Sequence, residues 1–364
     1  MKSPMLDLNR RQLLAGAAAL GVGGVLPWTT SPRAWAALPG PLRVNTIVSI
    51  WGREKDIKPF EQANGVEVRL TAWVSNIHQV TRTATGGTKL WDVITMINIF
   101  TDPVMRRKLF QPLDLSQVPN AAHLWPQFVK PTYAAYDGVQ YGLPYVWGYD
   151  SILYNRAKIQ KMESWKDMFD ERYKGRIALR DDPQFALPIA ALALGLTKDP
   201  FALGADELKE IKAFLVAKKP VIRKLWTGFA EALTLMRTGE VDALMGWLPM
   251  WRILRREGMD VDFIIPAEKA FGWVHVYLVS RETKVLPTAY KFLDYVLDTP
   301  FASSIARDLA YFSPSKKVLA GLSEADIKEL RYDRIDEIQR SLIWGDVPVN
   351  LQEWNDTWSA FKAA

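Results

Sequence analysis

The segment FGWVHVYLV, residues 271–279, contains side chains whose types and spacing could bind a ligand. Because side chains alternate between the two faces of a β-strand, one face is predicted to carry Phe271, Trp273, His275 and Tyr277. Aromatic faces attract alkylammonium groups through the ring quadrupole, and a histidine can be a base, a metal ligand or a hydrogen-bonding partner. The face therefore indicates either aromatic packing or the wall of a binding site.

Further candidate residues stand where predicted strands end. In open α/β sheets, ligands bind outside the carboxyl ends of the strands. Four side chains close or directly follow such strands: Trp51, Asp181, Asp182 and Trp247. Asp181 is expected to cap the following helix, which leaves Asp182 to face a ligand. Each position alone is compatible with packing, and together they predict a site.

The composition excludes several other kinds of site. The chain has no cysteine, and its three histidines, His78, His123 and His275, are far apart and lack H-E-x-x-H spacing. No metal centre is therefore expected. A nucleophile elbow and a glycine-rich phosphate loop are both missing from the sequence, so we predict no cofactor and no enzyme. The enzyme alternative, a periplasmic hydrolase or lyase, would use His275 with Asp182.

The N-terminal residues resemble an export signal. Arg10 and Arg11 precede an apolar run of small residues, LLAGAAALGVGGVL, which is short for a membrane span, and an A-x-A cleavage pattern ends at Ala36. The arginine pair resembles a twin-arginine signal, with Asn9 in place of the usual serine or threonine. We predict a signal over 1–36 and a periplasmic location. An uncleaved N-terminal anchor is the alternative.

The charge of the remaining chain argues against nucleic acid as a partner. Without the predicted signal, the chain keeps 42 lysines and arginines against 39 acidic residues, without a clustered basic run. About 328 residues remain, which is enough for two lobes with separate cores. Fifteen tryptophans exceed what a core of this size requires.

Strand-like and helical patterns alternate along the chain. Apolar strand-like runs lie at 42–50, 66–74, 91–97, 175–180, 241–247 and 261–267. Helical spacing of apolar residues lies between them, for example at 206–219 and 230–239. This alternation predicts an α/β fold with mostly parallel sheets. The aromatic-rich segment 144–155 is interpreted as a crossing between two lobes, and 271–279 as the return crossing.

With these motifs the sequence resembles a known family, the periplasmic solute-binding proteins for spermidine and putrescine that feed ABC importers. The resemblance covers nearly all of the chain after the signal. It rests on Trp51 and on GLPYVWGYDSILYN (142–155), SWKDMFDERYKGRIALRDD (164–182), GEVDALMGW (239–247), IIPAEKAFGW (264–273) and EWNDTWSAFKA (353–363). It implies a bilobal periplasmic-binding-protein fold, with two α/β lobes joined by crossover hinge strands.

The resemblance also implies the lobes and the partners. Lobe 1 is expected to comprise 37–145 plus 276–312, and lobe 2 to comprise 146–275 plus 313–364. The expected ligand is a small amine-bearing solute, a polyamine or a related amino-acid derivative, held between the lobes. The expected macromolecular partner is an inner-membrane ABC permease, and a monomer is expected.

The same resemblance supplies the candidate ligand-binding residues. They are Trp51, Arg53, Asp182, Phe185, Trp226, Trp247, Trp273, His275 and Tyr311, of which Trp226 is added here from its place before AEALTLM. The family's pattern has acids at the positions of Arg53, Phe185 and His275. Because only Asp182 remains acidic, the ligand is expected to carry one ammonium group, and an anionic group of the ligand is expected to meet Arg53.

Two further alternatives concern the ligand. Sugars also stack on tryptophan, so a carbohydrate-binding protein of the same fold is one alternative. A clamp for ferric iron fits less well, because the residue beside Tyr311 is Phe312 and not a second tyrosine.

Overall fold

The computed structural model describes residues 38–47, 53–73, 76–196, 199–346 and 348–364. All of them belong to the second of the two compact units into which the chain divides, Ala37–Ala364. The predicted signal over 1–36 and Trp51 therefore lie outside the described residues.

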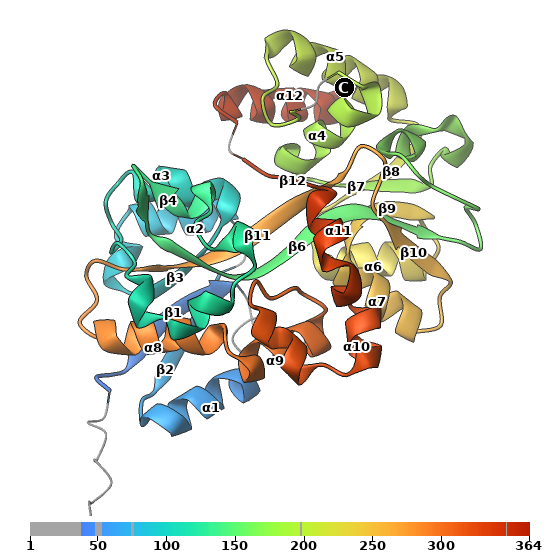
Figure 1. The fold of residues 1–364 in the computed structure, drawn as a ribbon. Helices are drawn as coiled ribbons and strands as arrows, with labels where there is room; N and C mark the ends of the chain where they lie inside the picture. The colour runs from blue at the N-terminus through green and yellow to red at the C-terminus, as the bar shows by residue number, and fades with distance from the viewer. Residues whose placement is uncertain (1–37, 48–52, 74–75, 197–198, 347) are drawn as a thin grey trace, which may run out of the picture. The chain divides into compact units, whose positions relative to one another are not determined.

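One mixed sheet of ten strands organises this unit (Figure 1). Hydrogen bonding gives the strand order β2-β1-β3-β11-β6-β9-β7-β8, with β10 added on β6 and β12 on β11. The bounds are β1 Leu42–Ile47, β2 Val68–Trp73, β3 Val93–Ile97, β6 Gly142–Asn155, β7 Ile177–Arg180, β8 Ile222–Trp226, β9 Ala243–Trp247, β10 Val261–Ile264, β11 Ala270–Val279 and β12 Leu342–Trp344. A separate hairpin pairs β4 Ala135–Tyr136 with β5 Val139–Gln140.

The two long strands β6 and β11 are shared by two groups of shorter strands. They pair antiparallel with each other, and β11 also pairs with β3 through 275–279. β6 pairs with β9 through 150–154, further along its length. Within each group the neighbours are parallel: β2, β1 and β3 in one, β9, β7 and β8 in the other.

The helices cover the faces of this sheet. Their bounds are α1 Glu54–Asn64, α2 Asn76–Ala84, α3 Thr101–Met105, α4 Pro183–Leu194, α5 Ala205–Lys218, α6 Phe229–Arg237, α7 Leu248–Arg256, α8 Leu286–Val296, α9 Thr299–Leu309, α10 Glu324–Glu329, α11 Ile335–Arg340 and α12 Leu351–Ala363. α4, α5 and α12 pack against one another, and α8 packs on β11 (Figure 1). The predicted helices at 206–219 and 230–239 are confirmed as α5 and α6.

Both faces of the long strands are buried. All ten residues of β11 and the first thirteen of β6 are buried, as near-continuous apolar strands covered on both sides require. The ladder between them skips Tyr145 of β6, because His275 pairs with Val146 and Val276 with Pro144. Such a bulge increases the local twist of a strand.

Candidate ligand-binding site

A guanidinium surrounded by aromatic rings forms the centre of one cluster. Arg180 is the last residue of β7, and its Cζ lies 4.5 Å from the ring centroid of Phe185, 5.3 Å from that of Trp247 and 6.0 Å from that of Trp226. Trp226 ends β8 and Trp247 ends β9, so three neighbouring parallel strands bring these side chains to one edge. Three predicted site residues, Phe185, Trp226 and Trp247, therefore meet around Arg180, which was not predicted as a site residue.

A buried carboxyl group lies beside this guanidinium. Asp150, on β6, is fully buried, accepts a hydrogen bond from Trp247 Nε1 and has Oδ1 at 3.7 Å from Arg180 Nη1. Its Oδ2 has no hydrogen-bond partner among the described residues. Burial raises the pKa of Asp150 to about 7, although the Arg180 charge and the Trp247 hydrogen bond favour the ionised form.

The second carboxyl group of the cluster begins a helix. Asp182 is the N-cap of α4 and accepts a hydrogen bond of 3.1 Å from the backbone N–H of Gln184. Its Oδ2 lies 3.5 Å from Arg180 Nη2, and its side chain is 24% exposed. Burial raises the pKa of Asp182, against the charge of Arg180 and the capping hydrogen bond.

The expectation that Asp181 caps this helix is wrong. Asp181 accepts a hydrogen bond of 2.6 Å from Trp358 Nε1 and pairs with Lys362 Nζ at 3.0 Å, both on α12. Pro183 occupies the first helical position, where its missing N–H costs nothing, and this makes Asp182 the capping residue. Asp182 thus combines the cap with a place beside Arg180.

The aromatic face of β11 divides into three parts. The two central residues, Trp273 and His275, lie 5.7 Å apart, measured between ring centroids. The Trp273 ring also lies 5.6 Å from that of Tyr311. Phe271 packs against Trp165 and Phe201 at one end, and Tyr277 packs against Tyr145 and Phe292 at the other. The two ends of this face therefore belong to aromatic cores, and its centre, Trp273 with His275, lies beside Tyr311.

His275 and Tyr311 are neutral at ordinary pH. Burial lowers the pKa of His275 to about 3 and raises the pKa of Tyr311. Asp150 and Arg180 both act electrostatically on the Tyr311 hydroxyl, and the Tyr311 ring also contacts Trp273, so Tyr311 is near both groups.

A glycine of β6 positions the Trp273 ring. Gly148 pairs with Trp273 across the β6–β11 ladder, and a Cβ at Gly148 would lie 2.8 Å from Cη2 of that ring, with Cζ2 closer still. The indole therefore lies directly on the Gly148 backbone, an approach that only glycine permits.

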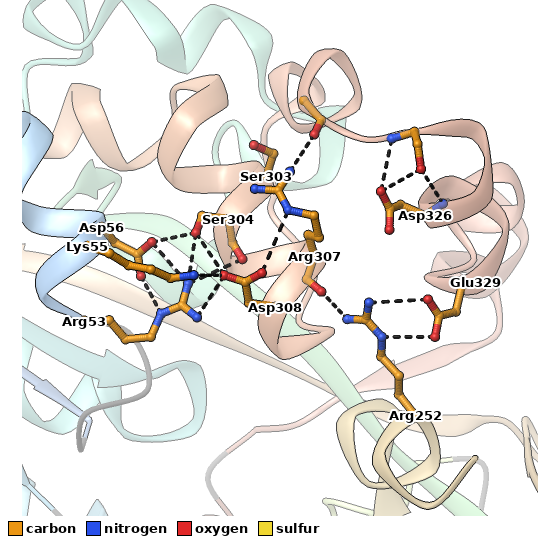
Figure 2. A network of polar contacts seen from close by, with 12 residues as sticks. Arg53, Lys55, Asp56, Arg252, Ser303, Ser304, Arg307, Asp308, Asp326 and Glu329 are labelled. Carbon is orange, nitrogen blue, oxygen red and sulfur yellow. Dashed lines mark hydrogen bonds and ion pairs between the residues drawn. The ribbon is translucent and has the colours of Figure 1, made fainter. Parts of the chain in front are cut away.

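Arg53 belongs to a different cluster (Figure 2). Its guanidinium pairs with Asp56 at 2.6 Å and with Asp308 at 3.1 Å, and it donates to Ser304 Oγ at 3.0 Å. Asp308 also pairs with Lys55. Two carboxylates already neutralise Arg53, so its expected role toward a ligand anion stays a prediction without support from these contacts.

The side chains of the described residues can be searched for a metal-binding arrangement. In the described parts of the chain, no group of three or more acidic or histidine side chains is placed to bind an ion. Nor does any helix there have the length and apolarity needed to cross a membrane.

Two residues of this cluster, Arg180 and Asp150, were not predicted from the sequence as site residues. Asp150 stands inside GLPYVWGYDSILYN as a lone acid in a fourteen-residue buried strand, which is itself a signal because a buried carboxyl group needs partners. Arg180 closes a strand whose other residues are apolar, and that end position is the corresponding signal.

A mixed sheet whose two long strands are shared by two groups of parallel strands, with helices packed on it, is the architecture of the bilobal periplasmic-binding-protein fold. The structure of the spermidine/putrescine ABC transporter substrate-binding protein PotD from Streptococcus pneumoniae matches with a TM-score of 0.75 and 20% identity, covering 88% of this chain and 98% of that chain. The predicted fold class is confirmed.

The sequence comparisons agree with the fold. Residues 55–330 match the profile of a family described as bacterial extracellular solute-binding protein. The spermidine/putrescine-binding periplasmic protein of Escherichia coli is 23% identical over 266 residues, 71% of this chain and 73% of that protein. The putrescine-binding periplasmic protein PotF of the same organism is 25% identical over 289 residues, 74% and 76% respectively. The chain belongs to the bacterial extracellular solute-binding proteins, which are not enzymes, and the hydrolase or lyase alternative has no support.

Proposed function

We propose that this protein is exported to the periplasm, captures a small amine-bearing solute between two lobes and delivers it to the permease of an ABC importer. The supporting observation is the set of aromatic rings gathered beside two carboxyl groups, Asp150 and Asp182. Aromatic faces and carboxylates together stabilise an alkylammonium group removed from water. The names of the two Escherichia coli relatives, which bind spermidine or putrescine, point to the same class of solute.

The proposed lobes are 37–145 plus 276–312 and 146–275 plus 313–364. Capture then follows from lobe closure, because a ligand that touches both lobes favours the closed state. The candidate residues come from both proposed lobes: Tyr311 from the first, and Asp182, Trp247 and Trp273 from the second. The protein acts as a monomer in this scheme, which light scattering of the purified protein tests directly.

Ligand screening tests the proposed solute class. Tryptophan fluorescence and calorimetry with amines and with sugars are expected to detect binding of an amine, accompanied by a more compact particle in small-angle scattering. Trp273→Ala should abolish both responses without unfolding the protein. Binding of a sugar in the absence of any amine binding would refute the amine proposal and favour the carbohydrate alternative.

Export has its own test. Replacing Arg10 and Arg11 with lysine is expected to leave the precursor in the cytoplasm, because twin-arginine export depends on that pair. Replacing Lys2 with arginine serves as the control, since it alters a basic residue outside the pair. Normal processing of the double lysine variant would assign the signal to the general secretory route.

A further inference from the structure

The aromatic rings proposed to receive the solute already surround a cation of the protein. Phe185, Trp226 and Trp247 all lie within 6.0 Å of the Arg180 guanidinium carbon, the range of a cation–π contact. The Arg180 side chain is 19% exposed, so most of its water has been removed. A diammonium solute would have to bind beside this positive charge.

Among the described residues, Arg180 has two ion-pair contacts and donates no hydrogen bond. A guanidinium carries five N–H donors in a rigid planar fork that matches an oxyanion. Its nearest carboxylate oxygens lie at 3.7 Å on Asp150 and 3.5 Å on Asp182, and the side chain donates no hydrogen bond to a described residue. The oxygen of Asp150 that faces Arg180 accepts from Trp247, and Asp182 accepts from the first turn of α4.

The charges around Arg180 do not cancel it completely at neutral pH. Burial raises the pKa of Asp150 to about 7 and also raises the pKa of Asp182, so both carboxyl groups resist ionisation. Tyr311, on which Asp150 and Arg180 both act electrostatically, is neutral because burial raises its pKa, and Asp181, whose charge also raises the pKa of Asp182, is paired with Lys362. Burial therefore opposes the ionisation of both carboxyl groups that could neutralise Arg180, and this favours an anion of the solute at the guanidinium.

We propose that Arg180 is the specificity-determining residue of the site: its guanidinium binds a carboxylate of the solute, and Asp182 binds the solute's single ammonium group. This inference rests on the proposed function and narrows it to zwitterionic amino acids, in which the amine and the carboxylate are at opposite ends. It assigns to Arg180 the anion contact that the sequence had suggested for Arg53.

Calorimetry with matched probes tests the proposal. The probes are ω-amino acids, the α,ω-diamines of the same chain length and the corresponding monocarboxylates. Wild-type protein is expected to bind the best amino acid at least about tenfold more tightly than its matched diamine, because a charge-assisted hydrogen bond is lost and a like charge is added.

Variants of Arg180 locate the effect. Arg180→Gln is expected to weaken amino-acid binding by about 10- to 100-fold and to leave diamine binding unchanged or tighter. Arg180→Lys keeps the positive charge but lacks the planar guanidinium, so its affinity for the amino acid should lie between that of wild type and that of Arg180→Gln. Arg223→Gln, on the exposed neighbouring strand β8, is the control for a lost arginine.

The outcomes separate this inference from the proposed function. A wild-type protein that binds diamines more tightly than amino acids overturns the inference and leaves an amine-binding function standing, and this comparison needs no variant to fold. Equal binding of amino acids by wild type and a folded Arg180→Gln variant also overturns it. If no amine of either series binds, the amine-binding function itself fails, and the inference fails with it.

Discussion

Asp150 is expected to make the stability of the protein depend on pH in an unusual direction. Burial raises its pKa from 3.8 to about 7, so the folded protein holds this proton more tightly than the unfolded chain does. The stabilisation is complete below pH ~4 and is lost as the pH rises through about 7. From pH 5 to pH 8 the free energy of unfolding should fall by about 2–3 kcal/mol on account of this group, since each unit of pKa shift is worth about 1.4 kcal/mol.

The variant Asp150→Asn removes this dependence. An asparagine can still accept the hydrogen bond from Trp247 Nε1, but it does not titrate. Urea unfolding at intervals between pH 5 and pH 8 is the assay. The free energy of unfolding of the variant, minus that of wild type, is expected to be about 2–3 kcal/mol larger at pH 8 than at pH 5.

A surface variant provides the control for this measurement. The hydrogen bond from Arg237 lowers the pKa of Glu257, which is therefore ionised throughout this range, so Glu257→Gln should change stability equally at every pH tested. If the stability profiles of wild type and Asp150→Asn are parallel from pH 5 to pH 8, Asp150 is ionised in the folded protein and the reasoning about its burial is wrong.

Two further predictions concern packing and a buried ion pair. Gly148→Ala should displace the Trp273 ring, destabilise the protein by about 1–3 kcal/mol and reduce the fluorescence response to ligand; an unchanged response would show that this ring position does not matter. Arg252→Met should destabilise by about 2–3 kcal/mol, because this buried guanidinium holds Glu329 and the C-terminal turn of α9 (Figure 2). Its matched control is Arg256→Met, which removes an exposed contact to the same Glu329 and should cost less than about 1 kcal/mol; equal costs would contradict the role of burial.

The strand 271–279 shows what periodicity can and cannot predict. Alternating side chains located the strand correctly, because that period follows from backbone geometry alone. The same period could not separate a binding wall from core, since both faces of β11 are buried. Phe271 and Tyr277 lie on the same face of the strand as Trp273. They belong to aromatic cores because of the residues that pack on them, such as Phe201 and Phe292, and the strand's own sequence does not show this.

The cluster around Arg180 could not be predicted from short stretches of sequence, for a different reason. Arg180, Asp150 and Trp247 come from three strands whose adjacency depends on the order β6-β9-β7, and no short stretch of sequence encodes that order. Asp182 was predicted as a site residue from a resemblance, and Pro183 could have identified it as the cap as well. Long-range pairing therefore limited the site prediction more than the recognition of single residues did.

The long strands β6 and β11 bear on the proposal that the ligand has a balanced charge. Each carries a buried ionisable side chain with a shifted pKa, Asp150 on β6 and His275 on β11. Strands covered on both faces exclude water, so between about pH 3 and about pH 7 both residues are held in their neutral forms, the acid by a raised pKa and the base by a lowered one. Arg180, at the end of β7, and Asp182, at the start of α4, are the residues to which the proposal assigns the carboxylate and the ammonium group of the solute. A dication would leave Arg180 uncompensated and opposed, whereas the proposed zwitterion meets both charges, and this agrees with the expectation, drawn from Arg53, Phe185 and His275, that the ligand carries one ammonium group.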